Sequence, residues 1–202
     1  MSDKHFKTNH RYFTVDTQWL EEFDSDAVVL YGLLKNISNK TPQKRYDSNG
    51  GVYYRIANKV IQKFSDLSKY KIKQYLKYLE ENGFITIYTL KKQTETFRYI
   101  KFNFEQRKYG FALNVYYDML YDNEDSLNYG LVYSYLIFDH NVNGNYILDT
   151  EEMFDVIGVD WSTYKKRHII KQLISENYIK VNFDYTEDFL DICDDYHFEW
   201  LP

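Results

Sequence analysis

The chain has 202 residues, of which 44% are hydrophobic and 27% charged, and its net charge is −5. No run of about 18 apolar residues occurs, which excludes a transmembrane helix, and the first residues, Met-Ser-Asp-Lys-His, lack the apolar segment of a signal peptide. The single cysteine, Cys193, excludes an internal disulfide and fits a reducing compartment. We therefore expect a cytoplasmic globular protein.

The charge is divided unevenly along the chain. Residues 1–108 carry 20 Lys and Arg against 12 Asp and Glu, a net charge of +8, whereas residues 109–202 carry 5 against 18, a net charge of −13. Such asymmetry indicates that the two halves have different partners. The first half is the one expected to bind a polyanion.

In chain order, the first half begins with a helix that Asp24 or Ser25 can cap and that runs to about Ile37. A basic loop, 38–51, follows. The next elements are a strand over 52–56, a helix over 57–64 and a turn over 65–67.

A third helix of the first half is predicted from Ser68, its N-cap, to about Asn82. Gly83 follows at the position where a helix commonly ends in a left-handed residue. Two alternating segments, 84–90 and 96–104, predict strands joined by a polar hairpin turn, 91–95.

The second half repeats the first. Residues 68–85 correspond to 162–179 at an offset of 94 without a gap, and apolar positions mostly meet apolar ones. The opening segments also correspond, with 13–16 resembling 111–114 and 30–34 resembling 132–136. A shorter connection, 141–145, then replaces the basic loop. The second copy is expected to end in strands 178–183 and 189–193, joined by an acidic turn, 184–188. Self-similarity of this kind indicates one small module used twice.

The order helix, strand, helix, turn, helix, hairpin resembles a winged helix-turn-helix. The segments that carry the resemblance are Leu67 to Gln74 and Leu79 to Ile85, which are similar to that family's recognition helix and its exit into the wing. The resemblance implies an α+β fold of two tandem winged-helix domains, 1–108 and 109–202. Tandem winged helices of this size also resemble replication initiators of plasmids and phages from low-GC bacteria.

The third helix offers a face that fits the major groove of DNA. At 100° per residue, Ile72, Leu76 and Leu79 gather on one side, and polar side chains gather on the other. Lys can approach guanine acceptors or phosphate, and Gln can pair with an adenine edge. Cations of the wing and of the basic loop extend this positive surface. The residues expected to contact DNA are Lys69, Tyr70, Lys71, Lys73, Gln74, Lys77, Lys91, Lys92, Arg98, Lys40, Lys44, Arg45 and Arg55.

The second copy has a comparable but weaker face. Its members are Tyr164, Lys165, Arg167, His168 and Lys171, and Lys166 occupies the position of the core residue Ile72, where its stem can snorkel outward. Carboxylates follow on its wing and tail, and a wing of that charge repels phosphate. For the second domain, dimerisation or docking of a protein partner is therefore favoured over direct DNA contact.

Metal and catalytic signals are weak. Asp139 to Gly144 matches the start of a calcium-binding loop, but Thr150 stands where a bidentate glutamate is needed, so a polar turn is favoured. The tail residues Asp191, Cys193, Asp194, Asp195, His197 and Glu199 lack the spacing of a zinc site. Phosphate-binding glycine loops and a nucleophile elbow are absent from the sequence. We expect no metal, no cofactor and no enzymatic activity.

Two functions remain open from the sequence. The first is a sequence-specific binder of double-stranded DNA, a replication initiator or transcriptional regulator of a phage or plasmid, acting as a homodimer. The alternative is a winged-helix protein-interaction module (an adaptor, inhibitor or DNA mimic) without direct DNA binding.

Overall fold

Helices and antiparallel strands alternate along the chain, so the fold is of the α+β class. The computed structural model describes residues 12–65, 67–93, 95–104, 112–116, 120, 126–143, 147–149, 154–155, 157–176, 179–181 and 195–200. Within these ranges the helices are α1 (Gln18–Glu22), α2 (Ser25–Asn39), α3 (Asn58–Ser65), α4 (Lys69–Glu81), α5 (Ser126–Asn143) and α7 (Thr163–Ser175). The strands are β1 (Tyr12–Asp16), β2 (Lys44–Tyr46), β3 (Val52–Arg55), β4 (Ile85–Lys92), β5 (Glu95–Phe102), β6 (Ala112–Tyr116), β7 (Ile147–Asp149), β8 (Ile179–Val181) and β9 (Asp195–Trp200).

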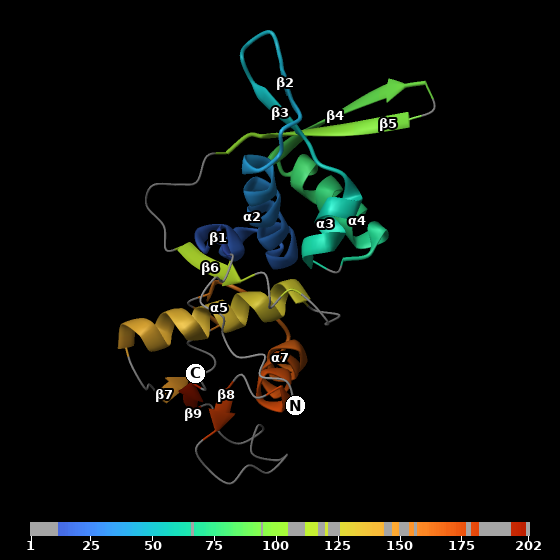
Figure 1. Cartoon of the computed structure of the whole chain (residues 1–202). Coiled ribbons are helices and arrows are strands. Elements are labelled where there is room, and N and C mark those ends of the chain that lie inside the picture. Colours follow the sequence, from blue (N-terminus) through green and yellow to red (C-terminus); the bar gives the residue numbers. More distant parts are fainter. Residues whose placement is uncertain are drawn as a thin grey trace.

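In the first half, one four-stranded antiparallel sheet packs against helices. Its strand order is β2-β3-β5-β4, and Figure 1 shows α2, α3 and α4 on one side of it. The central helix α2 is buried over most of its length because its segment is almost continuously apolar, and Asp24 caps it by accepting a hydrogen bond from the Ala27 amide at 2.9 Å. Aromatic edges fill the space around it, with Trp19, Tyr31 and Phe84 in mutual edge-to-face contact.

The second half follows the same plan. Its sheet has the order β7-β9-β8, which matches β3-β5-β4 of the first half strand for strand. Helix α7 starts and ends 94 residues after α4, and both helices begin at a serine N-cap, Ser68 and Ser162. Helix α5 occupies the place of α2 in the order of elements. The repeat seen in the sequence is therefore a repeat of topology.

The two halves contact each other through their opening strands and central helices. β1 pairs with β6 in antiparallel fashion, with Phe13 opposite Val115 and Val15 opposite Leu113, and α2 packs against α5. This junction lies midway along the molecule in Figure 1. Polar contacts also connect the two halves at this junction. The Ser25 hydroxyl donates to Asn128 Oδ1 at 3.0 Å and accepts from the Trp161 indole N–H at 3.0 Å. One apolar cluster runs through both halves.

Several sequence predictions of local structure are confirmed, and others are wrong in position. The helices at α2, α3, α4 and α7 and the strands at β3, β4, β5 and β8 occur where the sequence places them, within a few residues. The segment predicted as a basic loop, 38–51, instead contains the end of α2, strand β2 and the turn that joins β2 to β3. The wing turn is also shorter than predicted, because β4 continues through Lys92 and the chain reverses at Gln93, whose φ is +53°.

In the second half, two predicted positions differ from the structure. The connection predicted at 141–145 begins later, since α5 continues to Asn143. The strand that pairs with β8 is β9, Asp195–Trp200, whereas the segment predicted for it, 189–193, and the acidic turn 184–188 lie outside the described residues. Among the described helices, none is long and apolar enough to cross a bilayer.

Candidate nucleic-acid interface

Helix α4 is held against the first-half core by its apolar side. Ile72, Leu76 and Leu79 are buried at helical spacing, as the sequence predicts. At its start the Ser68 hydroxyl accepts a hydrogen bond from the Lys71 amide at 3.2 Å, and at its end Gly83 takes φ +76°, which only glycine adopts without strain. The helix is thereby fixed at both ends and along its back.

Two tyrosines lock α4 onto the start of α2. The Tyr75 hydroxyl donates to Asp26 Oδ2 at 2.6 Å, and the Tyr78 hydroxyl accepts from the Asp24 amide at 2.9 Å. Because both bonds connect side chains of α4 to the first turn of α2, they set the rotation of α4 about its own axis. The outward face of the helix is fixed as a consequence.

The outward face of α4 carries Tyr70, Lys73, Gln74 and Lys77, all exposed, and we call these residues the α4 face. Tyr70 is 69% exposed, and its hydroxyl accepts a hydrogen bond from Gln74 Nε2 at 3.1 Å. Lys77 lies 3.3 Å from Glu81 in an exposed ion pair, an interaction that is worth about 0.3–0.5 kcal/mol and is easily exchanged. Lys69 is exposed beside this face, and Lys71 is half-buried.

The wing contributes Lys91 and Lys92, which are exposed near the tip of β4. They point to opposite faces of the sheet because neighbours along a strand alternate. Lys91 shares the helix-facing side with Ile87, which packs on the core, and Lys92 lies opposite Glu95 on the other side. Only Lys91 therefore lies on the same side of the wing as α4.

Arg98 does not belong to the exposed surface that the sequence suggests. Its Nη2 donates to the Ile56 carbonyl at 3.0 Å, and its Nε is buried without a hydrogen-bond partner. Burial lowers the pKa of the guanidinium, although an arginine remains charged. The strand pairing explains this placement, since Arg98 lies on the same face as the buried Ile100, two residues on.

The cations of the β2–β3 hairpin divide between the two faces of the sheet. Lys44 lies opposite Tyr54, whose ring packs on the core and lies 5.2 Å from Lys44 Nζ. Arg45 and Arg55 lie on the opposite face, where their guanidinium carbons stand 5.1 Å and 4.1 Å from the ring centres of Tyr99 and Phe97. Lys40 is exposed at the C-cap of α2. The predicted single positive surface is therefore two surfaces.

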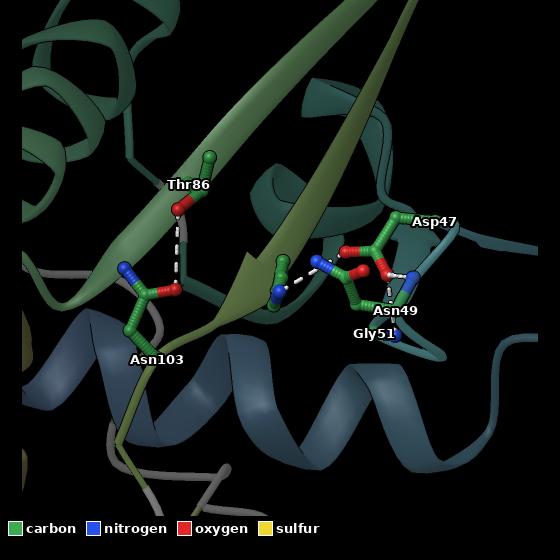
Figure 2. A network of polar contacts seen from close by, with 6 residues as sticks. Asp47, Asn49, Gly51, Thr86 and Asn103 are labelled. Atoms are coloured by element: carbon green, nitrogen blue, oxygen red, sulfur yellow. Dashed lines mark hydrogen bonds and ion pairs between the residues drawn. The ribbon is translucent and has the colours of Figure 1, made fainter.

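The turn between β2 and β3 is closed by one carboxylate. Asp47 Oδ1 accepts from the amides of Asn49 and Gly51 at 2.9 and 2.7 Å, and its Oδ2 accepts from Lys101 Nζ on β5 at 3.1 Å. Figure 2 shows Asp47 turned toward these amides, and it shows Thr86 of β4 bonded to Asn103 just after β5. The amides and Lys101 hold the pKa of Asp47 below its usual range. The turn of the β2–β3 hairpin is thus bonded to β5, one of the two inner strands of the sheet.

The second-copy face lies on α7. Tyr164 is 80% exposed and its ring stacks on that of His168, with centres 6.2 Å apart. Lys171 is exposed and Arg167 is half-buried. The Nζ atoms of Lys165 and Lys166 lie over the rings of Trp161 and Phe154 at 4.5 and 5.1 Å. Lys166, at the position of Ile72, therefore makes a cation–π contact there.

The calcium-loop positions Asp139, Asn141 and Asn143 are helical, because α5 extends to Asn143. They do not form the loop that a calcium ligand set of this type requires. No group of His, Cys, Asp and Glu side chains suited to a metal occurs in the part of the chain that the structure describes. Of the acidic tail, 191–194 lies outside that part.

Sequence reasoning missed one feature, an aromatic cluster on the sheet face turned away from the helices. Tyr53, Tyr88, Phe97 and Tyr99 share that face with Arg45, Arg55 and Lys101. The alternation of the strands contains the signal, since these residues occupy the positions between the core residues Tyr54, Ile87 and Ile100.

Comparison with known proteins identifies no relative. No family model matches the chain, and no curated protein and no solved structure shows a significant similarity to it.

Proposed function

We propose that the chain consists of two tandem winged-helix domains and binds duplex DNA through the first. The observation that carries the proposal is the α4 face, a set of exposed hydrogen-bond donors on a helix whose opposite side and both ends are fixed to the core. A recognition helix needs this combination, because donors reach base edges reproducibly only when the scaffold fixes their direction.

Topology supports the same proposal. The order α2, β3, α3, α4, β4, β5 and the sheet order β3-β5-β4 are those of a winged helix, with β4 and β5 as the wing. The equivalent order in the second half supports a second domain of the same kind, divided from the first near residue 108. Lys69 at the start of α4 and Lys91 on the helix-facing side of the wing can neutralise phosphates beside the groove.

The biological role proposed is replication initiation or transcriptional regulation in a phage or plasmid, with the second domain used for dimerisation or for docking a protein partner. Division of labour between the domains follows from their charge, +8 against −13, because a strongly acidic domain repels phosphate.

A selection from a random duplex library tests the proposal first. It should enrich one motif, and the arrangement of half-sites, palindromic or direct, would report the symmetry of the bound protein. Failure to enrich any motif argues against base recognition by α4.

A salt series on the enriched duplex, read by fluorescence anisotropy, measures the phosphate contacts. If about four phosphates are neutralised, affinity should fall on the order of a hundred-fold between about 50 and 200 mM salt. An affinity that does not change over this range, or absence of binding at the low-salt end, contradicts the proposal and favours the protein-interaction alternative.

A further inference from the structure

The sheet face that points away from α2, α3 and α4 is a second surface with its own chemistry. Residues directly opposite each other in an antiparallel sheet project to the same side. The pairs Arg45–Tyr53, Arg55–Tyr99, Tyr88–Tyr99, Leu90–Phe97 and Thr86–Lys101 therefore lie together. We call this set the outer sheet face.

The aromatic residues of the outer sheet face lie outside the apolar core cluster. Tyr53, Tyr88 and Phe97 do not pack against the apolar cluster, whereas Tyr54, Ile87 and Phe102 of the opposite face do. Tyr88 is 45% exposed. Only Tyr99 of the aromatic set is buried, and the guanidinium of Arg45 lies over its ring. Tyr53 and Phe97 are half-buried, so the face presents one open ring, Tyr88, beside two partly exposed ones.

The rings and cations form one continuous array. The Tyr88 ring lies close to both Tyr53 and Tyr99, with ring centres 6.3 and 6.4 Å away. Lys101 Nζ lies 5.6 Å from the Tyr53 ring, so each end of the array carries a positive charge. Arg55 extends the array over Phe97 at 4.1 Å. The face has two carboxylates: Asp47, which is engaged by the turn amides and Lys101, and Glu95, which lies opposite Lys92 near the tip of the wing.

We propose that the outer sheet face binds single-stranded nucleic acid. Unpaired bases expose π faces that stack on aromatic rings and on arginine planes, whereas bases inside a duplex do not. A guanidinium that rests on a ring keeps its outer plane available for a base, and its N–H groups remain able to meet phosphate. Arg45 and Arg55 offer this arrangement, although one N–H group of Arg55 is donated to Gln43 Oε1. Tyr88, on the edge strand β4, offers an open ring.

Charge complementarity selects this occupant. The cations of the face number more than its acids. Lys101 balances Asp47 and Lys92 lies opposite Glu95, which leaves the charges of Arg45 and Arg55 for a polyanion. An acidic protein segment would satisfy the cations but would not require the open ring of Tyr88. The contribution of stacking therefore separates the two occupants by experiment.

The test uses the full chain and labelled oligonucleotides of about twelve nucleotides, a length within the range that single-strand-binding surfaces cover. Fluorescence anisotropy at about 50 mM salt measures binding of oligo-dT and oligo-rU. Binding of either one supports the proposal, and the ratio of the two affinities reports which sugar the face prefers. Absence of binding to both overturns it.

Two matched pairs of variants identify the surface. Tyr88→Ala should weaken single-strand binding on the order of ten-fold, while Tyr88→Phe, which keeps the ring, should retain it. Arg45→Ala should weaken binding similarly, and Arg45→Lys should recover only part because lysine keeps the charge and loses the plane. The Phe and Lys variants preserve the strand, so they decide the matter even if an alanine variant unfolds.

A control on α4 separates this proposal from duplex recognition. Lys73→Ala removes one positive charge from the α4 face and should change single-strand affinity by less than about two-fold, the effect of a distant charge. If Lys73→Ala weakens binding as much as Tyr88→Ala does, or if Tyr88→Ala has no effect while Arg45→Ala does, stacking on the outer sheet face is wrong. Tyr88→Ala should leave duplex binding unchanged, so either proposal can fail alone.

Discussion

Helices α4 and α7 have the same frame and different surfaces. Both follow a serine N-cap whose hydroxyl accepts from the amide three residues on, at 3.2 and 3.3 Å, and both are 13 residues long. The offset of 94 aligns Lys73 with Arg167, Gln74 with His168 and Lys77 with Lys171. The comparison indicates that the N-cap and the spacing of the buried residues specify the helix. The exposed residues between the buried ones can differ, and with them the function of the helix.

The core contacts of the two helices differ at aligned positions, and the pair Ile72 and Lys166 gives the largest expected effect on stability. Ile72 is fully buried, whereas Lys166 is half-buried and its ammonium lies 5.1 Å from the centre of the Phe154 ring. Ile72→Ala should lower the free energy of unfolding by about 2–5 kcal/mol because a cavity forms. Lys166→Ala should cost less than about 1 kcal/mol. Denaturant unfolding measures both, and equal losses would mean that the two positions are equivalent.

The two serine N-caps should contribute equally to the free energy of unfolding if α4 and α7 begin in the same way. Ser68→Ala and Ser162→Ala each remove a side-chain acceptor from a helix start, so each should cost about 1 kcal/mol. For a chain of this length that loss corresponds to roughly 2–4 °C in thermal midpoint. Calorimetry checks the pair, and Ser→Asp at the same positions, which keeps a capping oxygen, serves as control. A negligible loss at either site would show that its cap is not used.

The Asp47 turn gives the smallest expected effect, and it concerns an element of the first half. Interactions in the folded state lower the pKa of Asp47 below its ordinary value of 3.8, so they stabilise the turn at pH above that value and are lost as pH falls through the lowered pKa. The amide resonances of Asn49 and Gly51 should hold their positions from pH 7 to about pH 4 and shift only below it. Asp47→Asn should abolish that titration. A shift centred above pH 4 would exclude the closed turn.

Much of the fold can be predicted from the sequence because its signals are local. Ser68, the spacing of Ile72, Leu76 and Leu79, and Gly83 together specify where α4 starts, which side it buries and where it ends. For α7 the shared signals are the N-cap Ser162 and the apolar positions Ile170 and Leu173. The exposed side of each helix follows from the buried side, so the α4 face was predictable residue by residue.

What the sequence hides is set by contacts distant along the chain. Strand β2 is exposed throughout and has no apolar alternation, so only its pairing with β3 defines it. The inward placement of Arg98 depends on which residues of β5 face the core. The pairing of Ile100 with Tyr54 decides this, because it places Ile100, and with it Arg98 two residues earlier, on the core-facing side of β5. The outer sheet face needs three strands in register before its rings meet. Short-range periodicity does not contain that information.

The most direct test of the account removes the polar side chains from the surface of each helix in turn and leaves the caps and core residues unchanged. The triple variant Lys73→Ala, Gln74→Ala and Lys77→Ala changes exposed side chains of α4, and the matched triple Arg167→Ala, His168→Ala and Lys171→Ala changes the aligned positions of α7. Duplex affinity is measured for both by anisotropy, with unfolding midpoints as the control for folding. At about 1–3 kcal/mol for each base contact, the α4 triple should reduce affinity at least a hundred-fold, and the α7 triple less than about three-fold. Equal effects, or a larger effect from α7, would contradict the assignment of DNA recognition to the first half.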